Sequence, residues 1–136
     1  MAILYVAKSP TVTEWASDVG LGKNIYKLGV ADDADAALAE LNTGVCGGAD
    51  WALVAKADAA DGATTEAAAE RAARKEKMID PKLYPRLRGA VGLFKVKQEN
   101  VENSVLLKKA LDGLQITAPK IKPADIANYL LKLAGG

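Results

Sequence analysis

Residues 25–41 read IYKLGVADDADAALAEL, and they combine a strand pattern with the start of a helix. The first six residues alternate between two faces, which is the period of a half-buried β-strand. Either Asp32 or Asp33 can then accept hydrogen bonds from the first free backbone N–H groups of a helix. That helix is expected to continue to about Leu41. This segment thus predicts one strand followed at once by one helix.

A second strand is predicted upstream, over residues 2–7 (AILYVA), and residues 9–22 are read as a loop. We expect the two strands to pair antiparallel, with Tyr5 and Tyr26 on neighbouring strands. Because two strands precede any predicted helix, a doubly wound parallel sheet is disfavoured. The chain is therefore expected to form an α+β fold, with a small, mainly antiparallel sheet of three or four strands flanked by helices.

The rest of the chain is predicted to add two strands and three helices. A threonine pair caps an alanine-rich helix, and Gly113 and Pro123 mark the boundaries of the last two helices. The last helix carries an apolar stripe that would pack against the body. We therefore expect one α+β domain over residues 1–112 and an extension with a helix, packed on the same domain, over residues 113–136. The predicted strands are 51–57 and 91–96, the helices are 64–79, 98–112 and 123–134, and the stripe is Ile126, Tyr129, Leu130 and Leu133.

Histidine is absent from the 136 residues, and there is one cysteine, Cys46. The lack of histidine excludes Ser-His-Asp and Cys-His catalysis and zinc sites built on histidine. Any metal would be held by carboxylates, which suit magnesium or manganese. A single cysteine forms no internal disulfide, as is typical of a reducing cytosol, and no apolar run approaches about 18 residues. We therefore expect a cytoplasmic protein with no membrane span.

Charge is divided unevenly along the chain. Residues 1–70 hold four lysines against eleven Asp and Glu, whereas residues 71–136 hold fourteen Lys and Arg against six acids. The positive second half favours a polyanion such as nucleic acid as a partner. An internally complementary dipole and an ordinary solvated surface remain open as explanations. The candidate nucleic-acid-binding residues are Arg71, Arg74, Lys75, Arg86 and Arg88.

Several short motifs follow one another in a defined order. They are Ile-Leu-Tyr-Val at residues 3–6, Tyr-Lys-Leu-Gly at 26–29, Leu-Ala-Glu-Leu-Asn at 38–42, Glu-Lys-Met-Ile at 76–79 and Leu-Phe-Lys-Val at 93–96. Over roughly residues 2–107, this order resembles the GIY-YIG nuclease superfamily. The resemblance is strongest to its viral branch, in which the second motif reads Tyr-Lys-Ile-Gly. It implies a GIY-YIG-like sheet and metal-dependent cleavage of a phosphodiester bond.

The resemblance gives a role to three side chains. Tyr5 takes the first tyrosine position of the family, Lys27 takes the second, and Glu76 takes the position of the metal ligand. In such a site magnesium or manganese polarises the phosphate, and the tyrosine or a bound water transfers the proton. The family's arginine does not carry over, because its place falls near Ala37, and the family's histidine is also missing. The catalytic set is therefore incomplete, and we expect cleavage to be weak or absent.

Three functions stay open at this point. The first is a magnesium- or manganese-dependent endonuclease. The second is a catalytically degenerate descendant that binds nucleic acid, DNA rather than RNA, without cutting it. The alternative is a non-enzymatic viral structural or inhibitory protein that binds a protein partner. From the residue pattern alone, Tyr5 can also be ordinary strand packing, Lys27 an edge residue and Glu76 half of an ion pair.

Overall fold

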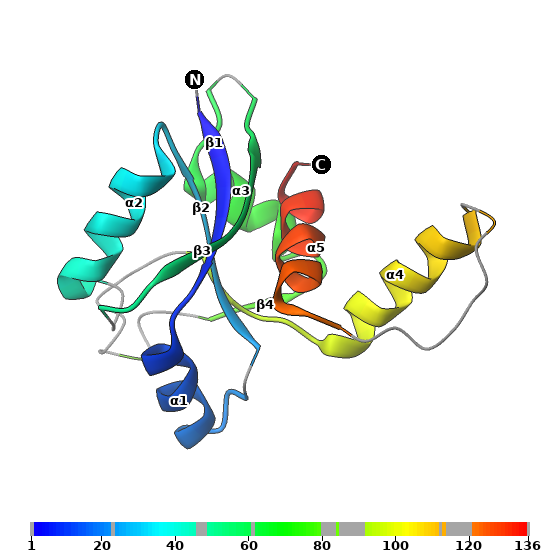
Figure 1. Cartoon of the computed structure of the whole chain (residues 1–136), viewed down its shortest axis with the longest axis horizontal. Coiled ribbons are helices and arrows are strands. Elements are labelled where there is room, and N and C mark those ends of the chain that lie inside the picture. Colours follow the sequence, from blue (N-terminus) through cyan, green and yellow to red (C-terminus); the bar gives the residue numbers. More distant parts are fainter. Residues whose placement is uncertain are drawn as a thin grey trace.

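The fold is an antiparallel sheet with helices on both faces (Figure 1). A computed structural model describes residues 2–22, 24–45, 49–60, 62–79, 84, 92–111, 113 and 121–135. In this part of the chain the sheet has five strands, in the order β3-β1-β2-β5-β4. The α+β class and the antiparallel sheet are confirmed, with one strand more than the largest number expected. The strands are β1 (Ile3–Lys8), β2 (Ile25–Ala31), β3 (Ala52–Asp58), β4 (Lys77–Met78) and β5 (Leu93–Lys95).

The first two strands pair antiparallel, as the sequence predicts. Tyr5 on β1 lies opposite Gly29 on β2. A Cβ atom added to Gly29 would lie 2.5 Å from the Tyr5 hydroxyl oxygen, so the tyrosine ring occupies the space that the glycine leaves empty. Tyr5 is 5% exposed in this position. The glycine of the second motif therefore allows a large side chain to pack flat on the neighbouring strand.

Helix α1 (Pro10–Asp18) occupies a segment that the sequence predicts as a loop, so this prediction is wrong. The Ser9 side chain accepts a hydrogen bond from the Val12 N–H at 3.2 Å. Pro10 sits in the first turn, where its missing N–H has no helical partner to lose. The Asp50 carboxylate accepts hydrogen bonds from the hydroxyls of Ser9 and Thr11. The serine–proline pair thus starts a helix, and Asp50 fixes that start near β3.

Helix α2 (Ala34–Glu40) begins as predicted, with Asp33 as its N-cap. The Asp33 carboxylate accepts from the N–H groups of Asp35 and Ala36. The helix continues into one π-helical turn, η1 (Leu41–Val45). There the Asn42 side chain donates to the Trp51 carbonyl at 3.1 Å and accepts from the Trp51 N–H at 2.6 Å. This two-way hydrogen bond joins the end of α2 to the start of β3.

Helix α3 (Thr65–Ala72) ends earlier than the predicted helix over residues 64–79. The chain turns after Ala72, and β4 pairs with β5 instead. The Ile79 N–H extends this pairing by donating to the Leu93 carbonyl at 2.8 Å. Alanine favours helix by only a few tenths of a kilocalorie per residue, so tertiary strand pairing overrides it here. Glu76, expected on the helix, therefore lies in the turn between α3 and β4.

Each face of the sheet has its own hydrophobic cluster. On the α1–α2 face, the strands pack against α1 and α2. On the α3–α5 face, they pack against α3 and the C-terminal helix. Neighbouring residues of one strand alternate between these faces, as a β-strand requires. The α1–α2 face includes Tyr5, Ala7, Val12, Ala16, Ile25, Leu41 and Leu93. The α3–α5 face includes Leu4, Val6, Tyr26, Leu28, Ala69, Ala72, Phe94, Val101 and Leu130.

The last two helices are α4 (Gln98–Leu111) and α5 (Pro123–Gly135), close to the predicted bounds. Helix α5 lies against α3 and against β1 and β3, whereas α4 extends away from the sheet (Figure 1). On the predicted stripe of α5, Ile126 and Leu130 are buried, and Tyr129 and Leu133 are half-buried. No helix among the described residues is both long and apolar enough to cross a membrane.

Leu130 provides a direct test of how strongly α5 holds the fold together. Its side chain is 0% exposed within the α3–α5 face. Leu130→Ala is expected to lower the free energy of unfolding by about 2–4 kcal/mol, because it removes buried methyl groups and leaves a cavity. Urea denaturation followed by circular dichroism measures this loss. Leu107→Ala is the control, since Leu107 is 62% exposed and should lose at most about 0.5 kcal/mol. Equal midpoints for the two variants would mean that α5 is peripheral.

Candidate functional site

Two of the three predicted catalytic residues lie together on the α1–α2 face. Lys27 on β2 pairs with Ala7 on β1 and lies beside Tyr5 on that face. Its Nζ atom is 6.0 Å from the centre of the Tyr5 ring and donates to the Leu28 carbonyl at 2.9 Å. Both side chains are buried, with Tyr5 5% and Lys27 6% exposed. The structure thus brings Tyr5 and Lys27 close to each other, inside the packed core of this face.

Glu76 lies on the opposite side of the sheet, with its carboxylate fully engaged. It is 3% exposed. One oxygen accepts from the Lys97 N–H at 2.7 Å, and the other accepts from the Asn100 side chain at 2.7 Å and the Tyr129 hydroxyl at 3.2 Å. Because Tyr129 packs against the cluster of the α3–α5 face, Glu76 belongs to that face. The structure therefore does not bring Glu76 together with Tyr5 and Lys27.

The Glu76 carboxylate has a clear structural role at the start of α4. Lys97 precedes the helix, and its carbonyl accepts from the N–H groups of Asn100 and Val101. Lys97 is therefore the N-cap, and Glu76 accepts the N–H of that residue from outside the helix. A negative charge at a helix N-terminus also interacts favourably with the helix dipole. Glu76 thus connects the turn after α3 to the start of α4 and to α5.

Glu76 is the one metal ligand that the sequence predicts, and no cluster of further ligands is found in the described part of the chain. Within that part, no three Asp, Glu or Cys side chains gather in a way that could hold a metal ion. Ala37, where the resemblance would place the arginine, packs against the cluster that contains Tyr5. The magnesium or manganese expected from the resemblance therefore has no ligand set among the residues that are described.

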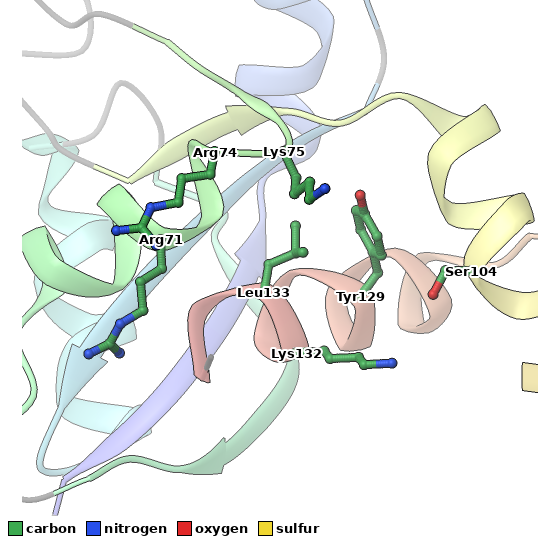
Figure 2. A pocket seen from close by; sticks show the side chains of 7 residues that line it. All are labelled: Arg71, Arg74, Lys75, Ser104, Tyr129, Lys132 and Leu133. Carbon is green, nitrogen blue, oxygen red and sulfur yellow. The ribbon is translucent and has the colours of Figure 1, made fainter.

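A basic pocket opens on the outer side of the α3–α5 face, where the end of α3 meets α4 and α5 (Figure 2). Its volume is about 490 Å³. Four of its seven lining side chains are cationic, and none is acidic. Figure 2 shows Arg71 and Arg74 on one side of Leu133 and Tyr129 on the other, rising from α5. The lining residues are Arg71, Arg74, Lys75, Ser104, Tyr129, Lys132 and Leu133.

Helix ends place the four cations of the basic pocket. Arg71 lies in the last turn of α3, and its Nη1 atom donates to the Ala134 carbonyl near the end of α5 at 3.0 Å. Lys132 lies in the last turn of α5. Cations at these positions interact favourably with the helix dipoles, which explains part of their placement. Arg74 and Lys75 follow in the turn after α3, and none of the four forms an ion pair with a described carboxylate.

Tyr129 forms part of the wall of the basic pocket, and its hydroxyl is hydrogen-bonded to Glu76. Burial raises the pKa of Tyr129 to about 12, and the charge of Glu76 and its hydrogen bond add to this rise. The hydroxyl therefore stays protonated at neutral pH and donates to Glu76. This bond fixes the position of the phenolic oxygen, and with it the direction in which the side chain points.

The sequence predicted part of this pocket and missed the rest. Arg71, Arg74 and Lys75, expected to bind nucleic acid, all line it. The other two expected residues, Arg86 and Arg88, lie outside the described residues. Tyr129 was predicted only as a packing residue, and Ser104 and Lys132 carried no signal. These three residues reach the pocket wall because α4 and α5 pack beside α3, and no local sequence pattern predicts that packing.

A second pocket, of about 590 Å³, lies between α1 and the start of β2. Its wall carries one cation, Lys8, and two carboxylates, Glu14 and Asp18. The Lys8 Nζ atom also lies 5.3 Å from the centre of the Tyr26 ring, a cation–π contact. A wall of mixed sign has no net attraction for a polyanion, so the basic pocket is the better candidate site.

Comparison with protein-family models, with curated proteins and with solved structures finds no match for this chain. The resemblance to the GIY-YIG superfamily therefore rests on the order and spacing of the sequence motifs. Any statement about function has to come from the geometry and charge of the described residues. Among these, the basic pocket combines four cationic side chains, and no acidic one, with a concave surface.

Proposed function

We propose that this chain is a non-catalytic, nucleic-acid-binding domain on a GIY-YIG-like scaffold, and that the basic pocket contacts the phosphate backbone. The observation that carries the proposal is that Arg71, Arg74, Lys75 and Lys132 all line one pocket without an acidic neighbour in its wall. Cations grouped in this way release counterions from phosphates when they bind them. DNA, in the cytoplasm, is the partner in this proposal, as the resemblance and composition imply.

The absence of cleavage in this proposal has two supports. The carboxylate of Glu76 is occupied by three donors and lies on the other face of the sheet from Tyr5 and Lys27. The family's arginine position holds Ala37, which carries no charge to stabilise a transition state. A nuclease of this type needs a metal ligand and a cation near the attacked phosphate.

The scaffold part of the proposal is supported by the first two strands and α2. Tyr5 and Lys27 lie on the same face, on neighbouring strands. Ala37 of α2 packs against the same cluster. These three positions, which the resemblance assigns to one reaction centre, are thus near one another even though their side chains form a packed core. The proposed protein keeps these three positions close together, but Glu76 lies on the other face, so the centre is not complete.

The binding part of the proposal predicts a steep dependence on salt. If all four cations of the pocket contact phosphates, the affinity for an oligonucleotide should fall by roughly 100-fold between about 50 and 200 mM salt. Arg74→Glu combined with Lys132→Glu should weaken binding to every sequence alike and reduce the slope of log affinity against log salt by about two. Fluorescence anisotropy of a labelled oligonucleotide, titrated at several salt concentrations, measures both quantities.

A matched control separates the pocket from net charge. Lys56→Glu combined with Lys122→Glu changes the total charge by the same amount at two exposed positions outside the pocket wall. We expect the control to keep most of the affinity and the full slope. Equal losses in the two double variants would show that binding is not centred on the pocket. Undetectable binding at low salt would reject the proposal and favour a protein partner.

A further inference from the structure

The basic pocket contains an aromatic ring as well as cations. Tyr129 is half-buried, and its ring forms the wall between Lys75 and Ser104 (Figure 2). Leu133 lies one helical turn further along α5 and lines the same pocket. Residues four apart on a helix are neighbours on its surface, so these two side chains form one apolar strip. The pocket wall is thus a flat apolar strip bordered by positive charge.

We infer that the basic pocket binds single-stranded nucleic acid in preference to a duplex, with an unpaired base stacked on Tyr129 and the adjacent phosphates held by the cations. This inference rests on the proposed function and specifies its ligand. Proteins that bind single strands combine a positive groove for the backbone with aromatic side chains for the bases. In a duplex each base is already stacked between its neighbours, so the ring would have no base face to contact.

The Tyr129 ring is prepared for stacking before any ligand arrives. Its hydroxyl donates to Glu76 at 3.2 Å. Glu76 is itself fixed by the Lys97 N–H and the Asn100 side chain, each at 2.7 Å. A side chain that is already ordered loses little conformational freedom on binding, so more of the stacking interaction contributes to affinity. This gives the buried Glu76 a role in positioning Tyr129.

The size and polarity of the pocket indicate what kind of strand it accepts. A volume of about 490 Å³ falls in the range of pockets that hold one small organic molecule, which corresponds to a base with its sugar rather than to a double helix. Ser104 is the only neutral polar side chain in the wall besides Tyr129. With so few groups to read base edges, the sequence preference should be weak.

Two substitutions at Tyr129 test the stacking directly. Tyr129→Leu removes the aromatic ring and the hydroxyl, whereas Tyr129→Phe removes only the hydroxyl. Both lose the hydrogen bond to Glu76, so any general effect of that loss is matched between them. The probes are a labelled oligothymidylate of about 15 nucleotides, taken as a single strand, and the duplex that it forms with oligodeoxyadenylate. Affinity is measured by anisotropy at one low salt concentration.

We expect the unmodified protein to bind the single strand at least about 5-fold more tightly than the duplex. Tyr129→Leu should lower the single-strand affinity by about 5- to 150-fold and leave the duplex affinity within about 2-fold. Tyr129→Phe should keep most of the single-strand affinity. Circular dichroism confirms that both variants are folded before binding is compared.

The contrary outcomes are distinct from one another. Equal or tighter binding of the duplex, with Tyr129→Leu affecting both probes alike or neither, would overturn the stacking inference and leave the proposed function standing. A loss in Tyr129→Phe as large as that in Tyr129→Leu would also overturn it, because the hydroxyl rather than the ring would then matter. Failure to bind either probe would overturn the proposed function, and this inference with it.

Discussion

Gly92→Ala is expected to destabilise the fold by more than about 4 kcal/mol. Gly92 has a φ of +95°, a backbone conformation that residues with a side chain rarely adopt. A Cβ atom at this position would lie closer than 3.0 Å to the Leu28 carbonyl oxygen and 3.0 Å from the Lys27 Nζ atom. The Leu28 N–H also donates to the Gly92 carbonyl at 2.8 Å. Because the clash is with the backbone of a central strand, no side chain can rotate to relieve it.

The size of the effect follows from two costs that add at Gly92. The left-handed conformation costs a residue with a Cβ about 1–2 kcal/mol. Displacing β2 from its neighbour adds the loss of strand pairing, so we expect a total loss of more than about 4 kcal/mol. The total stability of a domain of this size is about 5–15 kcal/mol. Urea denaturation monitored by circular dichroism measures this loss of stability.

Gly62 supplies the control for Gly92→Ala. It has a φ of +76°, and a Cβ atom there would meet nothing within 4 Å. Gly62→Ala therefore carries only the conformational cost, about 1–2 kcal/mol. If both alanine variants shifted the denaturation midpoint equally, an alanine at position 92 would not clash with β2. The close contact between Gly92 and Leu28 in the structure would then be contradicted. The comparison also tests the β2–β5 pairing, which joins β5 and β4 to the other three strands of the sheet.

Those parts of the fold that depend on local chemistry could be predicted from the sequence. The division of β2 residues between two faces and the Asp33 N-cap of α2 are both confirmed, because each depends on residues within a few positions. Helix α1 was missed because a serine followed by proline can end a strand or start a helix. The choice is made by Asp50, which binds the Ser9 and Thr11 hydroxyls from about forty residues away in the chain.

The candidate site was less predictable for the same reason. The cations Arg71, Arg74 and Lys75 could be identified by their density in the sequence, and they do line one pocket. The position of Glu76 could not be identified, because its partners come from the start of α4 and from α5. A carboxylate expected on an alanine-rich helix gives no local sign of these distant donors. Tyr129 became a site residue only through the packing of α5 beside α3.

Glu76→Ala is the second change with a large expected effect. Removing the carboxylate leaves three donors without their acceptor, namely the Lys97 N–H, the Asn100 side chain and the Tyr129 hydroxyl. A hydrogen bond to a charged group contributes about 1.5–3 kcal/mol, and a buried donor left unpaired adds its own desolvation cost. Since water can replace part of the loss, we expect the free energy of unfolding to fall by about 3–5 kcal/mol. Chemical denaturation of the purified variant measures this change.

The control for Glu76→Ala is Glu70→Ala. Glu70 is an exposed glutamate of α3, and its removal should change the stability by at most about 0.5 kcal/mol. Glu76→Gln should lie between the two, because its amide oxygen can still accept while its NH₂ group faces other donors. If the loss of stability decreases in the order Glu76→Ala, Glu76→Gln, Glu70→Ala, Glu76 is a structural carboxylate that orders the start of α4.

The same variants distinguish a structural carboxylate from a catalytic metal ligand. A metal ligand is not needed for the metal-free fold, so its removal would leave the stability nearly unchanged and abolish cleavage in magnesium or manganese. We expect the reverse: a large loss of stability in Glu76→Ala, and no metal-dependent cleavage of DNA even by the unmodified protein. Cleavage that disappears in Glu76→Ala, in a variant as stable as the parent, would show that the enzyme implied by the resemblance is active. In that case the face that carries Tyr5 and Lys27 could not be the reaction centre without a large rearrangement, because the carboxylate lies on the other side of the sheet.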